Sequence, residues 1–267
     1  MPSKKDLKEL LSFSQSLAQK SGEVVLKLQE KFKIVKYKDT QDIATSADLA
    51  SEKLIVSAIQ NTYPTHRIFS EEKGWIGNKS DYEWIIDPLD GTKEFARNIP
   101  LFNVSIALQF KGKLICSVVF RPSDRSLFSA AYGMGSFLGN SKIVTSKVES
   151  IDDSFVYCYI PSYHRQKENY EFAWHALSAV GKKVYRLRGL SDENTALSWL
   201  AQGSIEAYLN LGNPPKWHDI ASGLLIAKEA GAVITDIYGR PINNNVTNLV
   251  VACNAKIHQE LLKTING

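Results

Sequence analysis

Four acidic residues stand where two short apolar runs of the chain end: Glu71, Glu72, Asp87 and Asp90. Pro88 fixes its φ angle and Gly91 allows backbone conformations that other residues avoid, so the two aspartates, three positions apart in a tight turn, can face one point. Carboxylates held in this way repel one another unless cations lie between them. Hard oxygen ligands at a turn suit Mg²⁺, which binds proteins through a few carboxylates together with substrate phosphate. The stretch therefore predicts a magnesium site.

The residues that follow these acids offer backbone donors. The chain can begin a helical turn at Lys93, so that the N–H groups of Gly91 and Thr92 point outward unpaired. The beginning of a helix binds anions. Cations on one side and amide donors on the other form a cradle for phosphate, where bound metals activate water and stabilise the leaving oxygen. This combination predicts the hydrolysis of phosphate monoesters.

Each of these signals has a commoner explanation when it is taken alone. An Asp-x-x-Asp pair in a turn is more often a capping or surface pair, and Glu71-Glu72 is more often a solvated corner. Asp219 stands at the predicted start of a helix, where the alternative is a simple N-cap. The metal site is favoured because both apolar runs end in acids within about twenty residues, with Pro, Gly and Thr where the geometry needs them.

The elements expected around these residues follow from hydrophobic periodicity. Apolar residues at three- and four-residue intervals predict helices over 6–30 and 49–61, and shorter apolar runs predict strands. The further strands are expected at 67–70, 84–87, 102–110, 113–121, 184–188, 205–209, 233–235 and 249–251, and the further helices at 166–180, 194–202, 219–230 and 255–265. The pattern indicates layered sheets and helices in two lobes, residues 1–155 with most of the acids and residues 156–267 with Asp219.

Charge, cysteine and hydropathy patterns argue against several classes of protein. The 32 basic and 28 acidic residues give a net charge of +4 that is spread along the chain, so binding of a nucleic-acid polymer is not indicated. The three cysteines form no CxxC pair, which argues against a disulfide framework and a cysteine-based zinc module. No run of eighteen apolar residues occurs, so we expect no membrane association and a cytoplasmic location.

At these motifs the sequence resembles the inositol monophosphatase superfamily of lithium-sensitive, magnesium-dependent phosphatases. Four segments resemble the family's motifs in their order: Asp42-Ile43-Ala44-Thr45-Ser46-Ala47-Asp48, Ser70-Glu71-Glu72, Asp87-Pro88-Leu89-Asp90-Gly91-Thr92 and Trp217-His218-Asp219-Ile220-Ala221-Ser222-Gly223 with Glu229-Ala230-Gly231-Ala232. The resemblance implies an α/β (α+β) fold, the layered αβαβα sandwich of the inositol monophosphatase and fructose-1,6-bisphosphatase type. It also implies a homodimer and two to three Mg²⁺ ions as the cofactor.

The same resemblance implies roles for individual residues. The first magnesium would be held by Glu71, Asp87 and the Leu89 carbonyl, the second by Asp87, Asp90 and Asp219, and a third, weaker ion would lie near Glu71. The catalytic residues would be Asp48, Glu71 and Thr92, with Asp48 and Thr92 orienting the attacking water, and no covalent phosphoenzyme would form. The substrate would be bound by the N–H groups of Gly91 and Thr92 and by Asn210 and Asp219.

The identity of the substrate stays open between branches. Residues 93–95 resemble 3′(2′),5′-bisphosphate nucleotidases, whereas residues 99–106 resemble inositol monophosphatases. Asn210 stands where inositol-specific members carry a carboxylate, and residues 191–194 depart from the small Gly/Ser pattern of both branches. We expect an inositol phosphate, with nucleotide bisphosphates and sugar or histidinol phosphates as alternatives. A non-catalytic cation- or phosphate-binding protein on the same fold is the alternative of another class.

Arg186 and Arg188 are the remaining candidates for a substrate contact. They lie two positions apart on a predicted strand and would share one face, where they could meet a second phosphate. The alternative is an exposed edge strand whose charges keep it from pairing with another chain.

Overall fold

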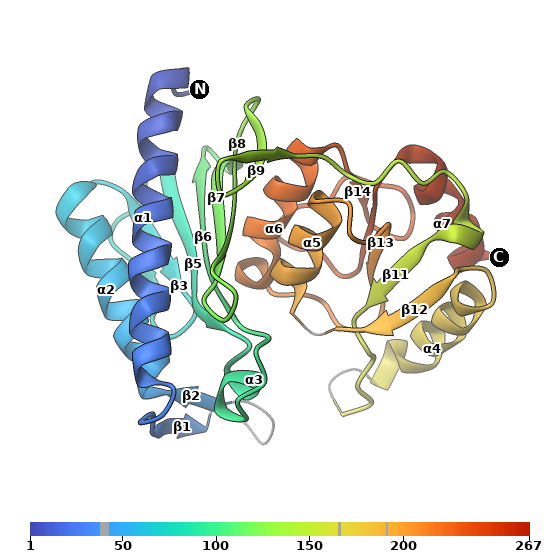
Figure 1. Ribbon diagram of the computed structural model, residues 1–267, viewed down its shortest axis with the longest axis horizontal. Helices are drawn as coiled ribbons and strands as arrows, with labels where there is room; N and C mark the ends of the chain where they lie inside the picture. Colours follow the sequence, from blue (N-terminus) through green and yellow to red (C-terminus); the bar gives the residue numbers. More distant parts are fainter. Residues whose placement is uncertain (38–42, 165–166, 191) are drawn as a thin grey trace.

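The chain forms alternating layers of helices and sheets. The computed structural model describes residues 1–37, 43–164, 167–190 and 192–267. Figure 1 shows two sheets with helices outside and between them, so the predicted αβαβα sandwich is confirmed. The outer helices are α1 (Lys4–Leu28) and α2 (Ser46–Thr62) on one side and α4 (Lys167–Gly181) and α7 (Ala255–Asn266) on the other, and the central layer holds α5 (Glu193–Ala201) and α6 (Trp217–Ala230).

The larger sheet has eight strands in the order β10-β9-β8-β7-β6-β5-β3-β4. Its strands are β3 (Arg67–Ser70), β4 (Gly74–Ile76), β5 (Tyr82–Asp90), β6 (Asn103–Phe110), β7 (Lys113–Arg121), β8 (Ser126–Ala131), β9 (Gly135–Leu138) and β10 (Ser141–Ile143). Lys111 and Gly112 join β6 to β7 with φ angles of 51° and 75°, the left-handed pair that a tight hairpin turn needs. All neighbouring strands are antiparallel except β3 and β5, which run parallel.

The smaller sheet has five strands in the order β12-β11-β13-β15-β14. They are β11 (Phe155–Cys158), β12 (Arg186–Gly189), β13 (Ala207–Asn210), β14 (Val233–Thr235) and β15 (Leu249–Ala252). Four short elements complete the described chain: β1 (Ile34–Tyr37), β2 (Ile43–Thr45), α3 (Thr92–Ala96) and the 3₁₀ helix η1 (Ile151–Asp153). Because β12 is an edge strand on which Arg186 and Arg188 are exposed, the alternative of a charged edge strand is confirmed.

The burial of each helix follows from its layer. The outer helix α1 begins at Ser3 with a capping box to Asp6 and buries one apolar face, which includes Leu7 and Leu11, against the large sheet. The central helix α6 lies between the two sheets, and all of its residues from Ile220 to Ala227 are buried. A helix that is apolar all round is stable only where both sides are covered.

The expected helices and strands are found within the described residues, with ends that shift by a few positions. Gly231 ends α6 in the left-handed conformation at φ 112°, as its position predicts. Gln166, at the expected start of α4, lies outside the described residues. The chain passes from the larger sheet to the smaller one near residue 155. Because α6 packs on strands of both sheets, the division into two lobes stays a prediction.

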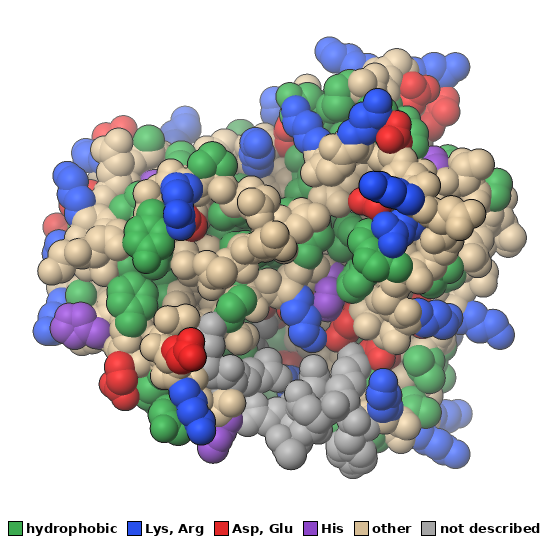
Figure 2. All heavy atoms as spheres, turned by 180° about the vertical axis from the view of Figure 1, so that it is seen from behind, with side chains coloured by type: hydrophobic (Ala, Val, Ile, Leu, Met, Phe, Trp, Pro, Cys, Tyr) green, Lys and Arg blue, Asp and Glu red, His purple; other side chains and the backbone are tan. Residues whose placement is uncertain are grey.

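Two further properties of the chain bear on its surroundings. Among the described helices, none combines the length and apolar character needed to cross a bilayer. All three cysteines are free and buried. On the face drawn in Figure 2, Lys and Arg side chains are scattered and interspersed with acidic ones.

Candidate active site

A β-bulge at the end of β5 turns two carboxylates toward one cavity. Asp87 pairs with Ser105 and Asp90 with Asn103, so β5 carries one more residue than β6 over this stretch. Pro88 is tolerated there because the pairing of β5 with β3 already ends at Ile86. The Asp87 side chain accepts a hydrogen bond from the N–H of Leu89 at 3.1 Å, which fixes the bulge.

Gly91 makes the turn from β5 into α3 possible. Its φ angle is 85°, and a Cβ atom at this position would lie 2.5 Å from the carbonyl oxygen of Leu101. Thr92 follows as the first residue of α3, and Gly91 accepts the hydrogen bond from the N–H of Phe95 at 2.9 Å. Any side chain at position 91 would therefore displace Thr92 and Asp90 together.

Asp48 lies behind Thr92. The Thr92 hydroxyl donates to Asp48 Oδ1 at 2.8 Å or to the Leu89 carbonyl at 3.0 Å. The other oxygen, Asp48 Oδ2, accepts from the N–H and the hydroxyl of Thr45 in the capping box of α2. The Asp48 side chain is 1% exposed, and Thr92, to which it is hydrogen-bonded, lines the cavity. Burial raises the pKa of Asp48 in spite of these hydrogen bonds.

The remaining predicted ligands come from two other elements. Glu71 directly follows β3 and Asp219 lies in the first turn of α6. The helix begins two residues earlier than expected, with Lys216 at the N-cap, so the alternative of a simple N-cap role for Asp219 is wrong. Both side chains line the cavity of about 450 Å³ into which the β5 bulge opens.

The cavity brings together residues that are far apart in the sequence. Of those predicted for the site, it is lined by Glu71, Asp87, Leu89, Asp90, Gly91, Thr92 and Asp219. Asp42, the first residue of the early motif, lies outside the described residues. In Figure 1 the site lies where the end of β5 near α3 approaches the central helices.

The carboxylates of the cavity perturb one another. Burial raises the pKa of Asp87 well above its usual value, and the nearby Glu71 and Asp219 raise it further. Burial also raises the pKa of Asp90 well above its usual value, together with Asp192 and Asp87. Burial raises the pKa of Asp219, although His218 and Lys216 act in the opposite direction. Such a group of oxygen donors fits divalent cations, whose charge would remove the repulsion.

The comparison with known protein families decides the family of the chain. A sequence profile of the inositol monophosphatase family matches residues 6–267. The chain belongs to the inositol monophosphatase family. The match covers the whole cavity, including β5, α5 and the start of α6.

Relatives and solved structures agree with this assignment. The protein is 35% identical to the Nus factor SuhB of Vibrio cholerae over 86% of each chain, and 31% identical to that of Escherichia coli over 95% of this chain and 94% of the relative. Its fold matches the extragenic suppressor protein suhB of Bartonella henselae with a TM-score of 0.90 at 25% identity, covering 97% of this chain and 98% of the other. It also matches an IMPase of Thermotoga maritima with a TM-score of 0.85 at 28% identity, covering 97% of each chain.

His218 is a site residue for which the sequence predicted no role. Ligand atoms of Glu71, Asp87 and His218 lie within 4.8 Å of one another, and the His218 ring stacks on Phe69. The imidazole is 6% exposed, and its Nε2 atom lies 3.2 Å from Asp219 Oδ1. Its sequence neighbours gave no signal for this role, because the contact of His218 with Glu71 and Asp87 joins α6 to the ends of β3 and β5.

The substrate side of the cavity also differs from the expectation. Asn210 is fully buried and does not line the cavity; instead it donates a hydrogen bond to Glu193 Oε1 at 3.2 Å. Glu193 and its neighbour Asp192 line the wall at the start of α5. The sequence signal for them was the departure of residues 191–194 from the small-residue pattern, although Ser191 itself lies outside the described residues.

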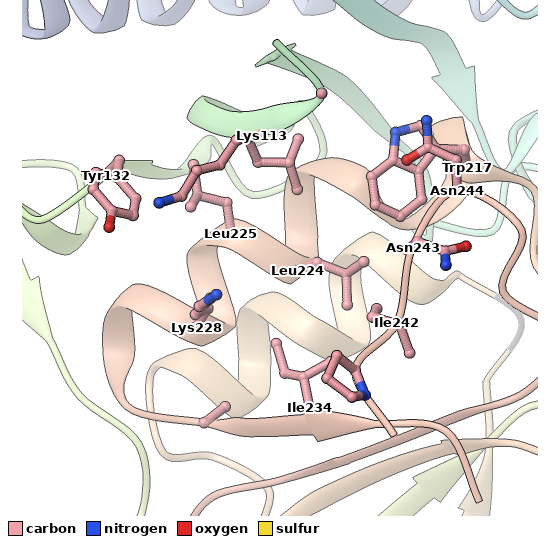
Figure 3. Close-up of a pocket in the computed structure, with 14 residues that line it drawn as sticks. Lys113, Tyr132, Trp217, Leu224, Leu225, Lys228, Ile234, Ile242, Asn243 and Asn244 are labelled. Carbon is pink, nitrogen blue, oxygen red and sulfur yellow. The ribbon is translucent and has the colours of Figure 1, made fainter. Parts of the chain in front are cut away.

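A second cavity, of about 300 Å³, lies against α6 on the side of the β6–β7 turn. Figure 3 shows Leu224, Leu225 and Ile234 on its walls and the Lys113 ammonium near Tyr132. The ammonium nitrogen lies 3.8 Å from the centre of the Tyr132 ring. None of the described residues that line this cavity carries a carboxylate, so it offers no oxygen cluster for a divalent ion.

Proposed function

We propose that the protein is a magnesium-dependent phosphatase of small phosphate monoesters, with an inositol phosphate as the first substrate to test. The observation that carries this proposal is the meeting of Glu71, Asp87, Asp90 and Asp219 around one cavity beside Thr92. To the family membership the proposal adds an activity, the metal, the roles of the residues and the substrate class. A homodimer and a cytoplasmic location remain part of the proposal.

The chemistry of the donors supports two to three Mg²⁺ ions. The first would be held by Glu71, Asp87 and the Leu89 carbonyl, the second by Asp87, Asp90 and Asp219, and the third near Glu71. Bound magnesium would lower the pKa of the attacking water and stabilise the leaving oxygen. Burial and the neighbouring carboxylates raise the pKa of Asp87 and of Asp90, and bound cations would offset this repulsion.

Thr92 and Asp48 would orient the attacking water. When the Leu89 carbonyl is bound to a cation, Asp48 Oδ1 is the remaining acceptor for the Thr92 hydroxyl proton. The lone pairs of Thr92 Oγ1 are then available to accept a hydrogen bond from water. Asp48 fixes this direction because Thr45 holds its other oxygen. Asp48 is thus a positioning residue, whereas Thr92 and Glu71 line the cavity.

The backbone of the β5–α3 turn would bind the phosphate. The N–H groups of Gly91 and Thr92 lie at the start of α3, where neither is used within that helix. They would hold the phosphate oxygens while water attacks from the side of Thr92, and no covalent phosphoenzyme is formed.

Phosphate release tests the proposal directly. The purified protein is assayed with Mg²⁺ and with EDTA on inositol 1-phosphate, adenosine 3′,5′-bisphosphate, fructose 1,6-bisphosphate and histidinol phosphate. We expect release that requires Mg²⁺ and is inhibited by lithium to an extent that varies with the magnesium concentration. Asp81→Asn is the matched control, because this exposed aspartate pairs with Lys111 away from the cavity. Absence of release from every ester would contradict the proposal.

The names of the relatives support a second candidate function. The proteins of Vibrio cholerae and Escherichia coli are called Nus factors, and a corresponding function of this chain would require a macromolecular partner. This function would also accommodate a non-catalytic cation- or phosphate-binding protein on the same fold. It predicts that the Asp90→Asn variant keeps any such partner, whether or not the unmodified protein releases phosphate.

A further inference from the structure

The second cavity, which lies against α6, has no part in the proposed phosphatase chemistry. Its volume of about 300 Å³ is at the lower end of the range of about 300–1,000 Å³ that small-molecule sites occupy. The β6–β7 turn, the turn after β8, one face of α6 and the chain that follows β14 enclose it. No described residue lines both this cavity and the one that holds the carboxylates.

The cavity is elongated along one face of α6. Leu224, Leu225 and Lys228 follow Trp217 by seven, eight and eleven positions, a spacing that places all four side chains on one face of a helix. At 1.5 Å per residue, this face is about 16 Å long from Trp217 to Lys228. Figure 3 shows these two residues at opposite ends of the cavity, with Leu224 between them. The small volume spread over this length suits a slender chain rather than a fused ring system.

The middle of the cavity is apolar. Four side chains of its walls are only partly buried against the apolar cluster around Leu224: Leu114, Ala232, Ile234 and Ile242. Leu114 also packs against two neighbouring clusters, so the cavity lies where three parts of the core meet. An apolar ligand would cover this surface, and each CH₂ group that it buries completely tightens binding by roughly fourfold.

One end of the cavity carries two ammonium groups. Lys113 and Lys228 both lie at this end, as Figure 3 shows. Within the part of the chain that the structure describes, neither lysine forms an ion pair. The acid that follows Lys228 in the sequence, Glu229, uses its two carboxylate oxygens to accept from the N–H groups of Gly133 and Gly135, at 2.9 and 3.0 Å. This end is therefore positively charged.

The opposite end of the cavity has no charge. Its walls are formed by Trp217, Asn243 and Asn244. A dicarboxylate would have to place its second charge there without a cationic partner, which costs free energy of desolvation. A neutral chain would not use the two ammonium groups at the other end. The cavity thus fits a molecule that is apolar along its length and anionic at one end.

We propose that this cavity is a binding site for straight-chain monocarboxylates of medium length, the chemistry of a fatty acid. The carboxylate binds between the ammonium groups of Lys113 and Lys228, and the alkyl chain lies along α6 toward Trp217. The inference does not depend on the proposed phosphatase function, because the two cavities share no described residue. Its failure would leave that function untouched.

Two matched ligands isolate the contribution of the carboxylate. Octanoate and octanamide have the same chain and nearly the same shape, but only octanoate is charged. Because hydrogen bonds between charged groups are stronger than neutral ones, we expect the dissociation constant of octanoate to be about fivefold lower. Decanoate has two more CH₂ groups and should bind about fourfold more tightly than octanoate, since part of the added chain is buried. Isothermal titration calorimetry of the Mg²⁺-loaded protein measures all three constants.

Variants of the cavity locate the two parts of the ligand. Lys113→Met and Lys228→Met remove a charge but keep an unbranched side chain, and each should weaken octanoate binding about twofold or more without changing octanamide binding. The double variant should bind both ligands equally. Lys111→Met is the matched control, because it removes a charge from the same β6–β7 turn, where the ammonium pairs with Asp81. Ala232→Leu fills the apolar middle and should weaken both ligands, and circular dichroism shows whether each variant is folded.

Four results would overturn the inference. Equal dissociation constants of octanoate and octanamide would refute the anionic end of the site, and no binding of either ligand at about millimolar concentration would refute the site as a whole. Octanoate binding that disappears in EDTA would show that the carboxylate binds metal in the other cavity. A dimer that sedimentation detects in Lys113→Met but not in Ala232→Leu would show that a second copy of the chain covers the cavity instead.

Discussion

Replacement of Thr92 by valine tests the connection between a buried carboxylate and the attacking water. Valine keeps the branched shape of threonine but removes the hydroxyl that donates to Asp48 Oδ1 at 2.8 Å. Because Asp48 is buried, this oxygen would be left without a donor. A hydrogen bond to a charged group contributes about 1.5–3 kcal/mol, so we expect a loss of about 2 kcal/mol in the free energy of unfolding. For a chain of this size that corresponds to a fall of roughly 4 to 8 °C in Tm.

The activity should fall much further than the stability. Orientation and proton acceptance by a positioned side chain contribute about 10²–10⁴-fold, so we expect kcat to fall at least about 100-fold while KM changes little. Thr92→Ser should restore most of both losses, because serine supplies the same hydroxyl. Phosphate release at saturating Mg²⁺ and thermal denaturation followed by circular dichroism measure the two effects.

A matched control excludes a general effect of the substitution. Thr62 on α2 donates its hydroxyl to the Ala58 carbonyl at 2.9 Å in an exposed position. Thr62→Val should therefore change Tm by only a degree or two and leave kcat unaltered. A Thr92→Val enzyme whose kcat lies within about twofold of the unmodified protein would refute the role that we assign to the Thr92–Asp48 pair.

Three further predictions concern the charges of the cavity. Asp90→Asn should lower phosphate release by at least about 100-fold and raise the Tm of the metal-free protein, because it removes a carboxylate that its neighbours repel; a lower Tm in EDTA would contradict this explanation. The pKa values of Asp87, Asp90 and Asp219 are raised in the folded state, so above about pH 4 the folded protein holds protons that the unfolded chain has lost. The stability of the metal-free protein should therefore fall as the pH rises from about 4 toward 7. Saturating Mg²⁺ should remove this decline. Denaturant melts at several pH values measure this, and stability that increases with pH would be the wrong sign. His218→Phe should weaken Co²⁺ binding by roughly tenfold and leave Mg²⁺ binding nearly unchanged, because an imidazole nitrogen binds Co²⁺ better than Mg²⁺. Calorimetry with each ion and the Co²⁺ absorption bands measure this, and an equal loss of affinity for both ions would contradict it.

Local sequence patterns predicted the elements that carry the site, because those patterns are repeated within each element. The apolar intervals of residues 6–30 correspond to α1 at Lys4–Leu28, and the acids after the apolar run at Trp84 lie at the end of β5. Pro88 and Gly91 were informative for the same reason, since their backbone restrictions act on adjacent residues. The family resemblance then supplied the grouping of these acids with Asp219.

The sequence did not predict how deeply each site residue is buried, because burial depends on packing between elements that are distant in the sequence. Asp48 and Thr92 both belong to the motifs, but only the packing of α2 against β5 places the first behind the second. Asn210 and Glu193 show the same limit: spacing alone does not indicate that Asn210 is buried and holds Glu193 at the cavity wall. Helix capping was a sufficient local explanation for Asp192, so its place beside Asp90 in the cavity wall could be recognised only in three dimensions.

The central layer explains how acids from three elements come to share one cavity. Helices α5 and α6 touch closely at Gly223, where a Cβ atom would lie 2.7 Å from Leu197 Cβ. Beside this contact, Asn194 accepts a hydrogen bond from the N–H of Gly223 at 2.9 Å, and its amide nitrogen lies 3.5 Å from Asp90 Oδ2. One side chain of α5 thus contacts α6 and the end of β5 together. Because both helices are covered by a sheet on each side, the acids at their N-termini cannot move apart to relieve their repulsion without disturbing the core, so the repulsion is relieved by bound protons or by bound cations.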